Sequence, residues 1–360
     1  MSRTGLPSPD TAGFSSEDQD PRLADWDRLA DWLRERGIGP DEDSRVEVLA
    51  GGTQNILIRY SHAGRDLVLR RPPLHLRKSS NSVLLREIEI LRALNGTDVP
   101  HAGLVAACTD DNVTGWVFYV MDMVDGFNPA VVVPPRFADS RDLRRDLAFH
   151  AMDVLATMGN LDHRSVGLEE FGKPEGFLER QVPRWLRELE SFSALDGYEG
   201  VELPGLDRIV TWLGENRPAF FRPGIMHGDY HLANLIFSED DARVLAVVDW
   251  EMATIGDPLL DLGRFLATWP SAEEPIGTAG PIYRTEGLPL ADELVNRYRA
   301  TSTLDVSAVD WYIVLACFKI GVILEGTHAR SCAGLADPAV GARLHRMSQA
   351  LFRRAERIVS

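Results

Sequence analysis

Two short stretches of the sequence, Met226-His227-Gly228-Asp229-Tyr230-His231-Leu232-Ala233-Asn234 and Val247-Val248-Asp249-Trp250-Glu251, decide how this part of the chain folds. Three of their polar side chains stand out: the carboxylate of Asp229, the amide of Asn234 and the carboxylate of Asp249. Asp249 ends an apolar run that begins at Val244, so we expect it at the end of a strand.

The residues between Asn234 and Asp249 predict a β-hairpin. The runs 235–237 and 244–248 are apolar, and the connection between them is mostly polar. A hairpin brings the start of its first strand beside the end of its second, so Asn234 and Asp249 would become neighbours. Their side-chain oxygens suit a hard cation such as Mg²⁺.

This arrangement predicts phosphoryl transfer. Asp229 and Asn234 have the D-x-x-x-x-N interval of a kinase catalytic loop, in which the Asp receives the hydroxyl proton and the Asn holds magnesium. We therefore expect Asp229 to be the catalytic base and Asn234 and Asp249 to be the metal ligands. The expected cofactors are Mg²⁺ and ATP, with GTP as the alternative nucleotide.

A second interpretation is a metal-dependent hydrolase. His227, Asp229 and His231 alternate, so on an extended strand they would face one side and could ligate zinc or iron. We rank this interpretation second, because Gly228 suits a loop and because the hydrolase leaves Asn234 and Asp249 without a role.

Composition limits the class of protein. The chain has 360 residues, enough for two lobes that each have a core. The formal net charge of −16 argues against general nucleic-acid binding. The three cysteines have neither metal spacing nor a disulfide framework, so we expect a cytoplasmic protein.

No membrane attachment is expected. The first twenty residues are rich in Ser, Asp and Pro, which predicts a disordered tail (residues 1–22) in place of a signal peptide. The apolar run 311–324 is interrupted by Lys319 and is short for a bilayer, so it predicts a buried core helix.

The N-terminal half predicts a nucleotide-binding sheet over residues 23–125. Short strands are expected at 46–50, 56–60 and 67–70, and the glycine-containing connection 51–55 lies between the first two. Its backbone N–H groups could approach phosphates, so four of its residues are assigned to nucleotide binding: Gly51, Gly52, Thr53 and Asn55.

A kinase also needs a cation on the third strand, paired with an acid on the next helix. The third strand ends at Arg70, and the helix expected at 83–94 carries Glu87 at the border of its apolar face. We therefore expect Arg70 to pair with Glu87. The strand expected at 117–121 leads into a connector in which the Asp122 carbonyl and the Val124 N–H could read adenine; residues 126–360 would form a helical lobe.

These residues together resemble the aminoglycoside phosphotransferase and choline kinase-like family. The motif His227-Gly228-Asp229-x-His231-x-x-Asn234, the Asp249 strand and Gly256-Asp257-Pro258-Leu259-x-Asp261-Leu262 match its pattern in order. The segments 69–73 and 171–181 are similar to proteins related to the kinase-like domain that is fused to some acyl-CoA dehydrogenases.

The resemblance implies an α+β, protein-kinase-like fold with a small β-rich N-lobe and a large, mainly helical C-lobe. It also implies an ATP-dependent kinase that acts on a hydroxyl of a small molecule. Four residues would support the site structurally: His227, His231, Asp257 and Asp261. Asp257 and Asp261 would do so by hydrogen bonds to the loop backbone. Arg70 departs from the wider family, which carries lysine there, and this motivates a third hypothesis: a nucleotide-binding module with little turnover.

The sequence does not decide which small molecule accepts the phosphoryl group. Acids in the pocket would favour an aminoglycoside or another amine, whereas a hydroxyacyl thioester would need basic residues. Arg77-Lys78 or Arg180 and Arg184 could supply these.

Overall fold

The computed structural model describes residues 20–23, 25–49, 55–73, 80–200, 203–271 and 280–360. The chain divides into two compact units: the first comprises Met1–Ile88 and Leu104–Met123, and the second comprises Glu89–Gly103 and Val124–Ser360. No helix within the described ranges is long and apolar enough to cross a membrane.

The first unit is built on an antiparallel sheet of five strands in the order β1-β2-β3-β5-β4. The strands are β1 (Glu47–Val48), β2 (Ile56–His62), β3 (Arg65–Arg71), β4 (Leu104–Cys108) and β5 (Phe118–Asp122). Ala63 and Gly64 join β2 to β3 and both have positive φ, 50° and 75°, which is the geometry of a tight turn whose twist matches its strands.

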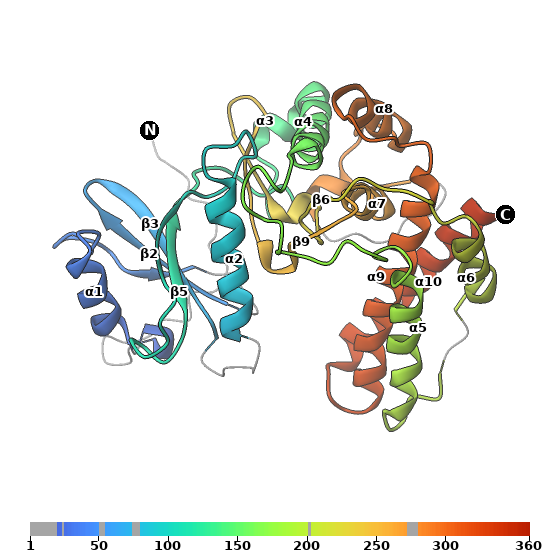
Figure 1. The fold of residues 1–360 in the computed structure, drawn as a ribbon, viewed down its shortest axis with the longest axis horizontal. Helices are drawn as coiled ribbons and strands as arrows, with labels where there is room; N and C mark the ends of the chain where they lie inside the picture. Colours follow the sequence, from blue (N-terminus) through green and yellow to red (C-terminus); the bar gives the residue numbers. More distant parts are fainter. Residues whose placement is uncertain (1–19, 24, 50–54, 74–79, 201–202, 272–279) are drawn as a thin grey trace. The chain divides into compact units, whose positions relative to one another are not determined.

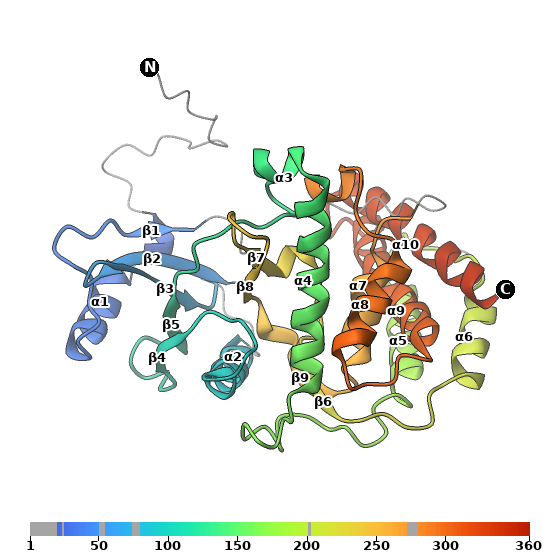
Figure 2. The same ribbon diagram turned by 90° about the horizontal axis from the view of Figure 1, so that it is seen from above.

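The two faces of this sheet carry different side chains, because successive residues of a strand point to opposite sides. Leu67 and Leu69 pack in one cluster with Leu29 and Leu33 of α1 (Trp26–Glu35), and Ile58 of β2 belongs to the same cluster. Figure 2 shows α1 close to the blue strands. The opposite face of β3 presents Arg70 to α2 (Ser80–Leu94).

The expected elements of this unit are present with shifted bounds. The helix expected at 83–94 begins earlier, at Ser80, and the first strand is shorter than expected, at Glu47–Val48. β4 was not predicted: its sequence Leu104-Val105-Ala106-Ala107-Cys108 shows no alternation, and four of its five residues are half-buried. Pairing with β5, which includes an irregularity between Leu104 and Ala106, is what makes this segment a strand.

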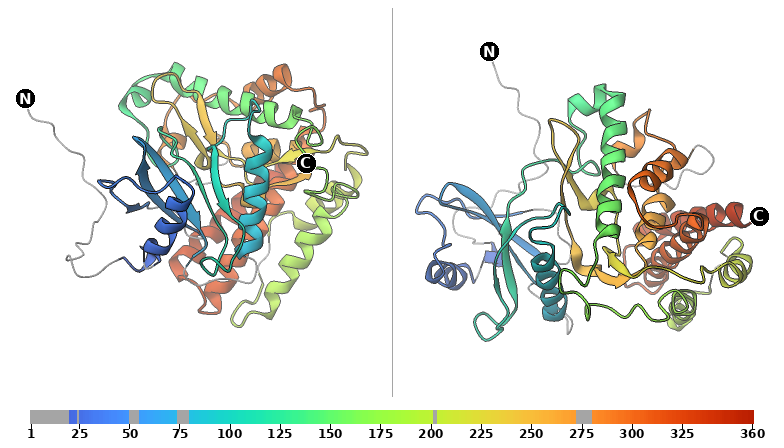
Figure 3. Two further views of the ribbon diagram at one scale, coloured as in Figure 1. Left: turned by 60° about the vertical axis from the view of Figure 1, so that its left-hand side comes forward. Right: turned by 45° about the horizontal axis from the view of Figure 1, so that its top comes forward.

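The second unit is mainly helical (Figure 1). Its long helices are α4 (Arg141–Asn160), α9 (Val309–Cys332) and α10 (Pro338–Val359), and its shorter ones are α3 (Pro135–Asp139), α5 (Gln181–Ser191), α6 (Leu206–Glu215), α7 (Leu259–Ala267) and α8 (Ala291–Thr301). α9 and α10 run along each other in both views of Figure 3, and α7 packs on α9. Trp311, Val314 and Phe318 of α9 are buried, so the apolar run is a core helix as predicted.

Two small antiparallel strand pairs lie within this helical unit. β6 (Gly224–Met226) pairs antiparallel with β9 (Thr254–Gly256), and β7 (Leu235–Phe237) pairs antiparallel with β8 (Val244–Val247). The predicted β7–β8 hairpin is therefore present. A five-stranded antiparallel sheet followed by a mainly helical part confirms the predicted α+β class.

Candidate active site

The loop that carries Asp229 begins with a backbone conformation that needs glycine. Gly228 has φ +86°, and a Cβ atom there would lie 2.5 Å from the carbonyl oxygen of Met252. Any other residue would be strained and would clash with backbone. Gly228 therefore fixes the direction in which the chain leaves β6.

Asp261 holds this loop from α7. Its carboxylate accepts hydrogen bonds from the N–H groups of His227 (2.6 Å) and Gly228 (2.9 Å). Burial raises the pKa of Asp261 to about 6, while the two N–H donors act in the opposite direction. The start of the loop that carries Asp229 is thus anchored to α7 by a buried carboxylate.

His227 lies beneath the loop and is fully buried. Its Nε2 atom is 2.9 Å from the Val248 carbonyl oxygen, and its Nδ1 atom accepts the Asp229 N–H at 3.3 Å. Burial lowers the pKa of His227, which favours the neutral imidazole. Because both ring nitrogens bind backbone groups, His227 does not join Asp229 and His231 as a metal ligand, and this part of the hydrolase hypothesis is wrong.

The Asp229 carboxylate contacts two side chains, those of Arg264 and His231. Its Oδ1 atom accepts a hydrogen bond from Arg264 Nε at 2.8 Å, and its Oδ2 atom lies 3.2 Å from His231 Nε2. Burial alone would raise the pKa of Asp229, but His231 and Arg264 together bring it below its usual value. The carboxylate is therefore ionised and fixed in orientation.

Asn234 is oriented by the loop itself. Its Nδ2 atom donates a hydrogen bond to the Asp229 carbonyl oxygen at 3.0 Å, so the Asn234 side-chain oxygen points away from that carbonyl. The Asn234 carbonyl accepts the Val248 N–H at 3.0 Å, and Leu235 pairs with Val247 across the hairpin. The backbone of Asn234 thus lies beside the residue that precedes Asp249.

Asp249 has a left-handed backbone, with φ +68° and ψ 61°. This conformation is uncommon outside glycine, and Asp and Asn adopt it most readily among the other residues. A strained residue at the end of a strand is typical of functional sites. The amide oxygen of Asn234 and the carboxylate of Asp249 are hard oxygen donors, which fit Mg²⁺ better than a soft metal.

Arg264 and Lys319 are site residues that the sequence analysis missed. Arg264 contacts Asp229 directly, and Lys319 Nζ lies 3.4 Å from the Gly228 carbonyl oxygen. Burial lowers the pKa of Lys319. A signal for Arg264 exists: it stands three residues after Asp261, and residues at that spacing share a helix face.

Asp257 has a different role from the one expected. It accepts hydrogen bonds from the Leu259 N–H (3.1 Å) and the Tyr312 hydroxyl (2.5 Å). Burial raises the pKa of Asp257 to about 6. Asp257 therefore supports the start of α7 and the packing of α7 on α9. Of the two aspartates, Asp261 is the one that binds the backbone of the loop carrying Asp229.

In the first unit, Arg70 and Glu87 meet as the sequence suggested. Arg70 donates to Glu87 Oε1 at 2.7 Å, and Tyr119, a residue not predicted, donates to Glu87 Oε2 at 3.2 Å. Glu87 is fully buried. Both oxygens of the Glu87 carboxylate thus accept hydrogen bonds, and the Arg70 guanidinium is fixed on the face of β3 that is turned toward α2.

The remaining residues predicted to bind the nucleotide lie in the connection before β2 and at the end of β5. Gly51, Gly52 and Thr53 lie outside the described residues, as do Arg77 and Lys78, and Asn55 directly precedes β2. Asp122 ends β5, pairs with Leu67 and binds Arg65 through its side chain at 3.1 Å. Val124 is a half-buried residue after that strand.

Comparison with known proteins defines the class to which this fold and site belong. The sequence profile of the phosphotransferase enzyme family matches residues 45–283. The chain belongs to this phosphotransferase family.

A mouse protein, acyl-CoA dehydrogenase family member 10, is 29% identical over 296 residues, which are 80% of this chain and 27% of the mouse protein. The chain spans 27% to 38% of the length of the acyl-CoA dehydrogenase family members that it matches. These sequences bear out the resemblance described above.

Solved structures confirm the kinase-like fold. A Ralstonia eutropha protein described as a candidate aminoglycoside phosphotransferase superposes with a TM-score of 0.74 at 29% identity, covering 92% of this chain and 98% of that protein. Aminoglycoside 2'-phosphotransferase-IIIa, solved with GDP, superposes with a TM-score of 0.62 at 13% identity, covering 93% of this chain and 100% of that protein.

Proposed function

We propose that this protein transfers the γ-phosphoryl group of Mg-ATP to a hydroxyl group of a small molecule. The observation that carries the proposal is the ionised Asp229 carboxylate, fixed by Arg264 and His231 on the same loop as Asn234. The acceptor oxygen forms a bond to the γ-phosphorus, the bond from that phosphorus to the bridging oxygen breaks, and ADP leaves. Asp229 receives the hydroxyl proton.

Each further residue has a role in positioning. Asn234 and Asp249 would hold Mg²⁺, which neutralises phosphate charge when bound. Arg70, oriented by Glu87, would contact phosphate oxygens; its guanidinium can form two parallel hydrogen bonds where lysine offers a point charge. Nucleotide binding by relatives of this fold, such as the GDP complex above, supports this assignment.

The charges beside Asp229 favour an acceptor that carries negative groups. Arg264 and Lys319 contact the catalytic loop, and Lys319 Nζ lies 5.7 Å from the centre of the Trp185 ring. The Arg184 guanidinium lies 5.1 Å from the same ring. These cations would repel a polyamine such as an aminoglycoside, whereas they suit a hydroxyacyl thioester whose carrier bears phosphates. The names of the matched acyl-CoA dehydrogenase family members agree with this choice.

The test is an acceptor panel with purified protein and Mg-ATP. We expect hydroxyacyl thioesters to accelerate ADP release and to gain a phosphate, and aminoglycosides to do neither. Asp229→Asn should lower the turnover number by about 10²–10⁴-fold while nucleotide affinity stays within a few fold. Full turnover by Asp229→Asn would overturn the role of this residue, and ATP binding without transfer to any acceptor would favour the nucleotide-binding module.

A further inference from the structure

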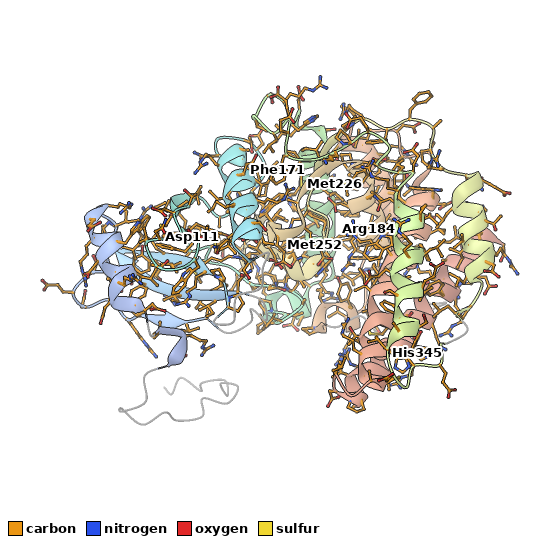
Figure 4. All side chains as sticks on the ribbon, turned by 60° about the horizontal axis from the view of Figure 1, so that its bottom comes forward. Asp111, Phe171, Arg184, Met226, Met252 and His345 are labelled. Atoms are coloured by element: carbon orange, nitrogen blue, oxygen red, sulfur yellow. The ribbon has the colours of Figure 1, made fainter. Side chains whose placement is uncertain are left out.

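A second group of chemically reactive side chains lies on the α9–α10 pair. Glu325 and His328 are three residues apart on α9, and His345 is on α10. One ligand atom from each of these residues lies within 4.8 Å of the others. We call Glu325, His328 and His345 the α9–α10 cluster. In Figure 4, His345 lies toward the end of the helix pair and apart from Met226 and Met252, which flank the catalytic loop.

The carboxylate of this cluster is deeply buried. Glu325 has no exposed surface; its Oε2 atom lies 2.7 Å from His345 Nδ1 and its Oε1 atom accepts the Tyr198 hydroxyl at 3.0 Å. An ionised carboxylate is costly to bury unless cations or donors surround it. Glu325 is thus held in place by contacts from two other elements, as a metal ligand needs to be.

The two imidazole rings leave one nitrogen unsatisfied. The rings of His328 and His345 stack with centroids 4.5 Å apart and planes 28° apart. His328 Nδ1 is a buried atom with no hydrogen-bond partner in the structure. An imidazole nitrogen is a common metal ligand, so the unpartnered Nδ1 atom of His328 is a candidate donor.

An ion pair between Glu325 and His345 is the simpler explanation of this cluster. That explanation accounts for the buried carboxylate, but it leaves His328 Nδ1 buried and unpaired. Buried polar atoms without a partner are rare in folded proteins, and a bound ion is one way in which such an atom is satisfied. A metal ion would engage all three side chains at once.

The donor set selects the metal. Two imidazoles and one carboxylate form the His₂Glu set that zinc uses with a fourth ligand, whereas Mg²⁺ and Ca²⁺ prefer oxygen donors. We propose that Glu325, His328 and His345 form a zinc-type transition-metal site that joins α9 to α10, with water as the fourth ligand.

The proposed site differs from the magnesium site of the phosphoryl-transfer reaction. It uses nitrogen donors and lies on other elements than Asn234 and Asp249. Its expected effect is structural, because a metal that binds the folded pair of helices and not the unfolded chain stabilises the fold. The presence or absence of kinase activity therefore does not decide whether the zinc site exists.

The test uses the full chain, free of any affinity tag and stripped of metal with a chelator. Calorimetric titration with Zn²⁺ should show one site per chain, and Zn²⁺ in hundredfold excess over its Kd should raise the melting temperature by about 5 °C. Co²⁺ in place of Zn²⁺ should give the visible absorption of a tetrahedral ion. Absence of both Zn²⁺ binding and this spectrum in the wild type would overturn the proposal.

Variants locate the site. His328→Gln and His345→Gln should each weaken Zn²⁺ binding by about 100-fold or more and remove the Co²⁺ spectrum. His150→Gln on α4 is the matched control for loss of a histidine, and Asp249→Asn excludes binding at the magnesium ligands; both should bind Zn²⁺ as the wild type does. Wild-type affinity in His328→Gln and His345→Gln would overturn the proposal, and the wild-type Co²⁺ spectrum decides the question if those variants do not fold.

Discussion

At the scale of single residues, the contact between Arg264 and Asp229 bears on the protonation of the proposed catalytic base. The hydrogen bond from His231 and the Arg264 guanidinium, whose Nε lies 2.8 Å from the carboxylate, together hold the pKa of Asp229 below its usual value against the effect of burial. Loss of the guanidinium should move this pKa upward. The base would then be protonated, and inactive, at a higher pH than in the wild type.

We therefore predict that Arg264→Gln shifts the acid limb of the kcat/KM profile toward neutral pH. Arg264→Lys is the matched control, because it keeps a cation near Asp229 and should retain most of the wild-type profile. The measurement is the pH dependence of ADP release with a saturating nucleotide. Superimposable acid limbs for the wild type and Arg264→Gln would show that Arg264 does not tune the base.

The pair of Arg70 and Glu87 predicts a loss of stability in the first unit. Glu87→Gln removes the charge that compensates Arg70 inside the protein, and a broken buried ion pair costs about 3–5 kcal/mol of the free energy of unfolding. Tyr119→Phe removes only a hydrogen bond to the same carboxylate and should cost about 1 kcal/mol or somewhat more. Urea unfolding followed by a probe in the first unit measures both, and equal losses would contradict this ranking.

At the scale of elements, the catalytic loop depends on how β6 and α7 meet it. Gly228 turns the chain after β6, and Asp261 of α7 binds the backbone N–H groups of His227 and Gly228. α7 also carries Arg264 toward Asp229. The short helix α7 thus holds the loop backbone through Asp261 and stabilises the ionised Asp229 carboxylate through Arg264.

We predict that Gly228→Ala destabilises the protein by about 2–4 kcal/mol and abolishes transfer, because the new Cβ atom would meet the Met252 carbonyl oxygen at positive φ. Gly214→Ala in α6 is the matched control: apart from its chain neighbours and the nearby backbone of its own helix, no described atom lies within 4 Å of its Cβ position, and alanine should stabilise the helix by about 0.5–1 kcal/mol. Thermal unfolding and turnover are measured on both variants. Wild-type stability of Gly228→Ala would contradict the strain that we assign to the loop.

The sequence predicted the local geometry of the site better than its long-range contacts. The β7–β8 hairpin follows from two apolar runs and a polar connection, and the Arg70–Glu87 pair follows from helix periodicity. Arg264 was missed because its three-residue spacing from Asp261 places it on the same face of α7 but does not show that it reaches Asp229. The strand β4 was missed because only pairing with β5 defines it.

At the scale of the whole molecule, the predicted site residues are divided between the two compact units. The first carries Arg70 on its five-stranded sheet and Glu87 on α2, and the second carries Asp229 on the loop after β6 and Asn234 and Asp249 at the ends of the β7–β8 hairpin. The order of these elements along the chain, sheet first and helices second, was predictable from the motifs. The acceptor was not predictable from the sequence. The cations that support the proposed anionic acceptor come from α5, α7 and α9, which are distant in sequence.

The central claim is phosphoryl transfer that depends on a metal ion held by Asn234 and Asp249. The most direct measurement is the Mg²⁺ dependence of ATP turnover with the hydroxyacyl thioester panel, comparing the wild type with Asp249→Asn. The account predicts turnover in the wild type that an acceptor accelerates, and a loss of about 10²–10⁴-fold in Asp249→Asn at the same Mg²⁺ concentration. Equal turnover by the two proteins, or no binding of Mg-ATP by the wild type, would contradict it.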